Sequence, residues 1–270
     1  MRFVSLRLLH SVFVLWAVVT LMFLMFRLMP GDPMSAYISE ALSEESRQSI
    51  RAQFGLDLPL WQQYFVYLAN LCRGELGVSF FQKLPVLGIV LTALPNTLAL
   101  TFSSLILAYL FGIVAGAFLA WLRGTWVEGV VIPLALATRA APEFWVGMIF
   151  LSIFAFSLGW FPSGGAASPG AIYDSEWQRM FSLDFLHHLA LPVLTLALYL
   201  QGLPLLLMRS TMLDVMHEEY ITMARMKGFS ASRIVLNHAA RNALLPVATA
   251  FALSMGQLVG GNVEIGRAHV

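Results

Sequence analysis

Long apolar runs, interrupted by few charges, dominate the pattern of this sequence. Between Arg7 and Arg27 there are 19 residues without a charge, and between Lys83 and Arg123 there are 39. A helix rises 1.5 Å per residue, so about 20 residues cross a hydrocarbon core of about 30 Å. These runs predict membrane-spanning helices. The first is predicted to stay uncleaved, because no small-residue cleavage site precedes Arg27.

Charges and prolines set the boundaries of five predicted spans. They run over about 8–26, 96–121, 130–157, the charge-free interval between Asp184 and Arg209, and 246–263. Pro95, followed by Asn96, marks the start of the second span. Gly112 and Gly116 in that span predict tight packing against a neighbouring helix, with no chemistry implied. The fold class predicted is all-α: a polytopic membrane helical bundle with five spans visible.

Four segments follow from this division. Residues 1–29 form the N-terminal segment and first span, 30–94 an external subdomain, and 95–263 a core membrane domain with a polar loop at 214–246. In the external region, residues 42–56 and 59–71 predict two short amphipathic helices near the headgroups.

Residues 264–270 fit nothing before them and are interpreted as a non-native tail, with a sixth span expected to be missing. The alternative is a genuine short tail.

The composition supports an integral membrane protein. Charged residues make up 11% of the 270 residues and apolar residues 59%, with a mean hydropathy of +0.76. Soluble domains carry about 25% charged residues. The single Cys72 excludes an internal disulfide framework and a cysteine-based metal site. The net charge of +1 gives no indication of a nucleic-acid partner, and none is predicted.

The positions of the basic residues predict the orientation. Arg2, Arg7, Arg123 and the basic residues of 209–241 fall on one side of the membrane, whereas the short loop 159–185 carries one basic residue and three acids. Basic loops are cytoplasmic by the positive-inside rule. The polar loop 214–246 is therefore expected to face the cytoplasm.

This polar loop carries the strongest functional signal. It predicts one helix over about 215–227, ended by Lys227 and Gly228, and a second that begins near Ser230 or Ser232 and runs to Pro246. The number of basic residues alone would indicate only that the loop lies on the cytoplasmic side. The small residues and the glycine corner indicate more. Ala224 and Gly228, four residues apart, suggest a face that allows close approach by a partner.

An ordered series of residues in the loop resembles a known family. The series is Tyr220, Ala224, Gly228, Arg233, the run His238-Ala239-Ala240-Arg241-Asn242-Ala243, and Pro246. With RLMPGDP at 27–33, LGV at 76–78, LPNTLAL at 94–100 and GWFPSGG at 159–165, it is similar to inner-membrane permease subunits of bacterial ABC importers, in the dipeptide, oligopeptide and nickel group. The triplet at 222–224 is Thr-Met-Ala, where the broader superfamily has Glu-Ala-Ala.

The resemblance implies a permease subunit of the bacterial inner membrane, with no catalysis of its own. The helix before Gly228 would be a coupling helix that docks on a cytoplasmic ATPase. The residues assigned to this coupling are Tyr220, Thr222, Ala224, Arg225, Lys227, Gly228, Arg233, His238, Arg241 and Asn242. The implied partners are a homologous second permease, two ABC ATPase subunits, an extracytoplasmic solute-binding protein and membrane lipid. ATP and Mg²⁺ would be bound by the ATPases, since this chain has no G-x-x-x-x-G-K-[ST] loop. The implied cargo is peptides, or a solute such as a nickel chelate or glutathione.

Two charges inside the third span are candidates for the translocation path. Arg139 and Glu143 lie four residues apart, so one helix face could hold both as an ion pair. Charges at this depth tend to face a water-filled cavity. The alternative is a pair near enough to the cytoplasmic end to snorkel.

Other functions are weighed on specific residues. His187-His188 suggests a metal pair, but adjacent residues point to different helix faces and no metal site is predicted. A stand-alone secondary transporter should carry more intramembrane acids. A membrane-embedded serine protease would need a histidine at the depth of Ser152 or Ser157, and no histidine lies within the core of a span apart from His10, near the inner edge.

Overall fold

The computed structural model describes residues 2–28, 58–79, 82 and 84–261. Over these residues the chain is helical, with no β-strand and one isolated bridge between Val78 and Pro85, which confirms the all-α class. The chain divides into two compact units, Met1–Thr92 and Ala93–Val270. Predictions for residues 42–56 and 264–270 lie outside the described residues.

The first unit holds α1 (Arg2–Leu28) and α3 (Leu60–Arg73), so the helix predicted over 59–71 is confirmed. Aromatic side chains join the two helices. The ring of Phe23 lies 5.3 Å from that of Tyr64 and 5.6 Å from that of Tyr67, and the hydroxyls of Thr20 and Tyr64 are 2.7 Å apart. This hydrogen bond pairs the two hydroxyl groups, which would otherwise be unsatisfied in an apolar contact.

The second predicted span begins earlier than expected. Helix α4 runs over Val86–Trp121, so it starts ten residues before Asn96 and takes Pro95 into its interior. Proline removes one backbone donor, but a helix can continue through it where the surroundings satisfy the freed carbonyl. The prediction from Pro95 was therefore wrong about the boundary and right about the span.

The third predicted span is broken. Helix α5 (Trp126–Ala140) and helix α6 (Glu143–Phe150), which continues as the π-helical η1 (Leu151–Ser157), meet at an angle of 103°. The break lies at Ala141, whose extended backbone (φ −69°, ψ 141°) is the conformation that a following proline enforces. A continuous span over 130–157 was thus the wrong interpretation.

The fourth predicted span is a pair of helices. After the short α7 (Glu176–Met180), α8 runs over Leu183–Leu200 and α9 over Gly202–Val215. The hydroxyls of Ser175 and Ser182 accept hydrogen bonds from backbone N–H groups at the starts of α7 and α8. Between α8 and α9 stands Gln201 alone. Pro204 has no N–H to donate to the carbonyl of Leu200, which interrupts the hydrogen-bond ladder there.

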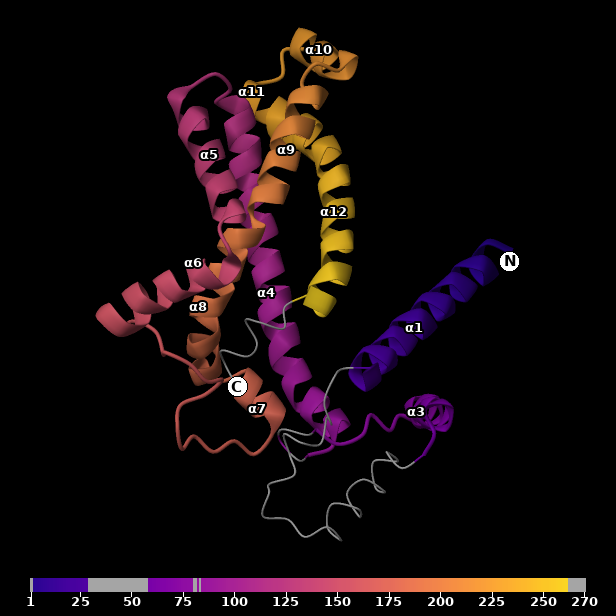
Figure 1. Ribbon diagram of the computed structural model, residues 1–270. Helices are drawn as coiled ribbons and strands as arrows, with labels where there is room; N and C mark the ends of the chain where they lie inside the picture. The colour runs from indigo at the N-terminus through magenta and orange to yellow at the C-terminus, as the bar shows by residue number, and fades with distance from the viewer. Residues whose placement is uncertain (1, 29–57, 80–81, 83, 262–270) are drawn as a thin grey trace. The chain divides into compact units, whose positions relative to one another are not determined.

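The polar loop and the last helix complete the second unit. Helix α10 covers Glu219–Met226, and the chain continues through α11 (Ala231–Arg233) and the π-helical η2 (Ile234–Ala239) into α12 (Ala240–Gly261). The predicted second arm therefore does not stop at Pro246 but passes through it. Figure 1 shows α10 at the same end of this unit as the turn between α4 and α5, with α7 at the opposite end.

Fewer helices than predicted meet the length and composition of a span. Among the described residues they are Val4–Leu28, Val86–Trp121 and Leu183–Leu200, or four if the bent pair at 126–157 counts as one. Helix α12, the predicted fifth span, is not among them. It holds Arg241, Asn242, Thr249 and Ser254, which lower its apolar character.

Two glycines of α4 bring it into backbone contact with α9. A Cβ on Gly112 would lie 2.7 Å from Cγ of Pro204, and a Cβ on Gly116 would collide with the carbonyl oxygen of Leu205. Both glycines are buried, as are Leu205 and Met208 on the facing side. The predicted close packing is confirmed, with α9 as the partner helix.

We expect Gly116→Val to destabilise the packing of α4 against α9. No side chain fits beside the Leu205 carbonyl, so the two helices must separate, at a cost of about 1–3 kcal/mol. The thermal unfolding midpoint of the purified protein measures this. The matched control is Gly88→Val in the same helix, where a Cβ would meet no described atom within 4 Å. Equal midpoints for the two variants would contradict the contact.

Candidate functional site

Helix α10 is fixed to the bundle through one buried face. Ile221 is fully buried and Ala224 is 5% exposed, and both join a core cluster with residues of α4, α9, η2 and α12. Their neighbours in this cluster include Met208 and Met212 of α9. A displacement of α10 would therefore act on α9 and α12 through these buried contacts.

The small size of Ala224 thus has a different reason from the one predicted. The sequence suggested that Ala224 and Gly228 share a face open to a partner. In the structure Ala224 faces the chain's own core, while Gly228 lies beyond the end of the helix. The close approach at Ala224 is to the bundle.

Gly228 ends α10 in a two-bond cap. Its φ of 77° is left-handed. Its N–H donates to the carbonyl of Arg225 at 2.9 Å, and the N–H of Phe229 donates to that of Ala224 at 3.3 Å. This pair of bonds is the Schellman arrangement, in which a glycine satisfies the last carbonyls of a helix. The predicted glycine corner is confirmed.

Phe229 holds the two arms of the loop together, and sequence reasoning missed it. Its ring stacks on the imidazole of His238 at 5.5 Å, and the Arg233 guanidinium lies 4.6 Å from its centre. A second link is a 2.7 Å hydrogen bond from the Asn242 amide to the Tyr220 hydroxyl. The position after the capping glycine often carries an apolar contact to the helix, which is the signal that could have found Phe229.

The opposite face of α10 is exposed. Met223 and Met226 are 57% and 75% exposed, although the surrounding loop is polar. Among the predicted site residues, those exposed at this end are Tyr220, Thr222, Arg225, Lys227, Gly228, Arg233, Arg241 and Asn242. Of the predicted set, only Ala224 is fully covered, and His238 is partly covered by Phe229.

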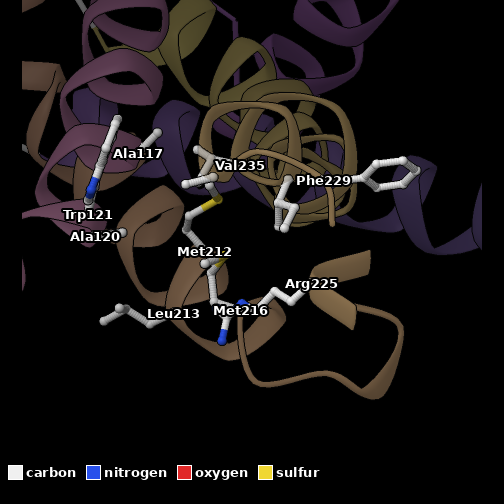
Figure 2. A pocket seen from close by; sticks show the side chains of 11 residues that line it. Ala117, Ala120, Trp121, Met212, Leu213, Met216, Arg225, Phe229 and Val235 are labelled. Atoms are coloured by element: carbon white, nitrogen blue, oxygen red, sulfur yellow. The ribbon is translucent and has the colours of Figure 1, made fainter. Parts of the chain in front are cut away.

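A groove of about 350 Å³ lies beside α10, between the ends of α4 and α9. Figure 2 shows Met212 and Met216 along it, with the Arg225 side chain reaching in from α10. The rest of the lining is apolar and includes Trp121, Phe229 and Val235. Arg225 is the one cation among these lining residues, and it shares the groove with the polarisable thioethers of Met212 and Met216.

An ion pair between α5 and α9, which the sequence analysis did not predict, lies at the same end of the unit. The Arg209 guanidinium donates to Glu128 Oε1, with its Nε at 2.6 Å, and Glu128 Oε2 accepts the N–H of Gly124 at 2.6 Å. The two side chains are 25% and 12% exposed. Glu128 therefore ties the α4–α5 turn to α9.

The other predicted site residues do not join the loop. Arg139 ends α5 and Glu143 begins α6, so the break at Ala141 removes the shared helix face on which their pairing was predicted. Both histidines at 187–188 bind backbone oxygens instead of converging on a metal: His187 that of Trp160 and His188 that of Asp184. The described residues hold no cluster of three metal-ligating side chains.

Comparison with known proteins decides the family. Residues 112–266 match the binding-protein-dependent transport system inner membrane component, and residues 1–101 match the N-terminal part of such membrane components. The chain belongs to this family. The permease is therefore a multi-pass inner-membrane protein of ABC transport systems and not an enzyme, which excludes the membrane-embedded protease and the stand-alone transporter.

Curated relatives cover most of the permease. It is 36% identical over 262 residues to the di/tripeptide transport system permease of Pseudomonas aeruginosa, covering 92% of this chain and 77% of that one. It is 34% identical over 260 residues to an oligopeptide permease of Bacillus subtilis (96% and 80% covered) and 33% identical over 265 residues to a glutathione permease of Escherichia coli (98% and 81%).

The cap of α10 generates one prediction. A Cβ on Gly228 would meet no described atom within 4 Å, so the glycine is needed for its conformation and not for space. Gly228→Val should cost about 1–2 kcal/mol or more and expose Arg225 and Lys227 to faster trypsin cleavage, whereas Gly228→Asn, which tolerates positive φ, should cost much less. Equal cleavage rates in the two variants would show that φ is not the constraint.

The Glu128–Arg209 pair generates another prediction. Glu128→Gln and Arg209→Gln should each lower the thermal unfolding midpoint, because each leaves a mostly buried charge without its partner. The charge swap Glu128→Arg with Arg209→Glu should recover part of the loss in a double-mutant cycle. Arg123→Gln, which removes an exposed charge at the same turn, is the control and should change little. Additive losses without recovery would rule out a direct pair.

Proposed function

We propose that this permease forms, with a homologous second permease, the translocation path of an ATP-driven importer for peptides or a related small solute. Two cytoplasmic ABC ATPases would bind ATP and Mg²⁺, and a solute-binding protein would deliver the cargo from outside. The permease would supply no cofactor site of its own. Helix α10 would be the coupling helix that docks on one ATPase.

The observation that carries this proposal is the division of α10 into two unlike faces. One face is locked into the bundle by Ile221 and Ala224, and the other presents Met223 and Met226 to solvent. Exposed thioethers within a basic loop suit a partner surface that combines an apolar groove with acidic edges, since methionine adapts to irregular pockets. A partner that moves this helix would act on the bundle through the buried face.

Peptides are the cargo class that the relatives favour. Their names refer to di/tripeptides, oligopeptides and glutathione, and all three cargoes carry peptide bonds and free carboxylates. Arg139 and Glu143 remain the candidates for the path. Arg139 lies 13 residues, about 20 Å, along α5 from Trp126 at the turn, which argues against snorkelling to the cytoplasmic end.

A double variant tests the docking face. Met223→Gln with Met226→Gln should leave membrane insertion and thermal stability unchanged, because both side chains are exposed. It should abolish co-purification of the ATPases and reduce ATP-dependent peptide uptake in proteoliposomes by tenfold or more. Uptake by the wild-type chain in the absence of any ATPase would overturn the proposal itself.

The matched control is Leu236→Gln on the second arm of the loop. Leu236 is 68% exposed, similar to the two methionines, and the change in polarity is of the same kind. ATPase retention should survive in this variant. If Leu236→Gln loses the ATPase while the methionine variant keeps it, the docking surface lies on η2 and not on α10.

A further inference from the structure

One buried polar atom in the second unit has no hydrogen-bond partner. Gln201, between α8 and α9, is 4% exposed, and its side-chain oxygen Oε1 is unpaired among the described residues. Its Nε2 donates to the hydroxyl of Thr138 on α5 at 3.3 Å. A buried acceptor without a donor is costly, so such an atom indicates either function or a missing partner.

The orientation of this amide follows from its neighbour. The single hydroxyl proton of Thr138 is used on the carbonyl of Ala135, at 2.9 Å. With its proton on Ala135, the hydroxyl accepts from Gln201 Nε2, and this arrangement leaves Oε1 as the unpaired group. The group that is lacking must be a donor.

Arg139 carries free donors beside this acceptor. It follows Thr138 on α5, and its Cβ and Cδ would both lie 3.7 Å from a Cβ on Gly202, the residue after Gln201. The side chain is exposed, and no hydrogen bond or ion pair to its guanidinium is found within the described part of the chain. The stem of this cation thus lies against Gly202, the residue that follows the unpaired acceptor in the chain.

Helix lengths put both residues at about half the depth of a bilayer, at a place where two helices are interrupted. Counted from the Glu128–Arg209 pair at the polar end, Arg139 is 11 residues along α5 and Gln201 is 8 residues along α9. These lengths are about 16 Å and 12 Å, close to half of a hydrocarbon core of about 30 Å. In Figure 1, α6 turns away from α5 beside the junction of α8 and α9. Charged side chains at such depth face a water-filled cavity.

We propose that Arg139 binds the carboxylate of the peptide cargo, and that Gln201 Oε1 accepts the guanidinium when the cargo leaves. The proposal rests on the proposed function, since it requires a cargo with a free carboxylate. Guanidinium and carboxylate match in planar, two-bond geometry. Gln201 is a positioning residue in this scheme: it offers Arg139 a second partner, so that the cargo is released and not held.

The two roles predict different changes in uptake by the complete transporter. The probes are trialanine and its C-terminal amide, each delivered by the same binding protein. Arg139→Gln should lower the ratio of acid to amide uptake by about tenfold, because the bond to a charged group is lost, and Arg139→Lys should restore much of it. The preference of the binding protein is the same for every variant and cancels when ratios are compared.

Gln201→Met should slow the maximal uptake of trialanine about two- to tenfold and leave that of the amide nearly unchanged, because only the acid has to be released from Arg139. A merely structural role for Gln201 would instead lower thermal stability and ATPase retention. Arg139 is exposed, so its variants are expected to fold, and they keep the proposal testable if the Gln201 variant does not insert.

Trapping of the cargo gives an independent readout. In a Cys72→Ser background, Arg139→Cys should form a disulfide with a tripeptide that carries an activated cysteine, whereas Leu134→Cys should not. Leu134 lies on the same helix and is 62% exposed. Equal trapping at both positions, or an unchanged acid-to-amide ratio in Arg139→Gln, overturns this proposal alone. Absence of ATP-dependent uptake of trialanine by the wild-type chain overturns the proposed function with it.

Discussion

The backbone contact between α4 and α9 is the constraint on which the rest of the second unit depends. Gly112 and Gly116 let the two helices approach until Pro204, Leu205 and Met208 fill the space that side chains would otherwise take. In a membrane, helix association depends on such packing because lipid tails are as apolar as leucine. With α9 fixed in this way, the residues it carries toward α5 and toward α10 are fixed as well.

Helix α9 connects the two candidate sites. Gln201 directly precedes α9, and Arg209 in the middle of α9 pairs with Glu128 of α5. Met212, in the last turn of α9, packs against the buried face of α10. From Gln201 to Met212 there are 11 residues, or about 16 Å of helix. A rigid element of this length transmits a displacement at one end to the other, since packed interiors have low compressibility. A pull on α10 would therefore be felt at the interruption beside Thr138.

Local chemistry made the polar loop predictable from sequence. A basic last turn followed by Gly228 ends a helix by backbone capping alone, so the corner needed no knowledge of the tertiary fold. The direction of Ala224 could not be deduced, because one small residue fits equally against a partner and against the chain's own core. Phe229 was missed since its partners, Arg233 and His238, lie on the second arm and come within reach only after the corner has folded.

Prolines in the apolar runs show where sequence reasoning is weakest. Pro95 was interpreted as a helix start and is an interior residue, whereas Pro142 was passed over and stands at the 103° bend between α5 and α6. Each removes one backbone donor. The difference lies in tertiary packing: α4 continues through Pro95, while at Pro142 the chain turns away from α5 beside Gln201. An amide with an unpaired oxygen is costly in such a place, and a fully apolar helix junction would be more stable. Its presence at the junction of four helices is consistent with a residue that stabilises a different state of the permease, in which the oxygen gains a donor.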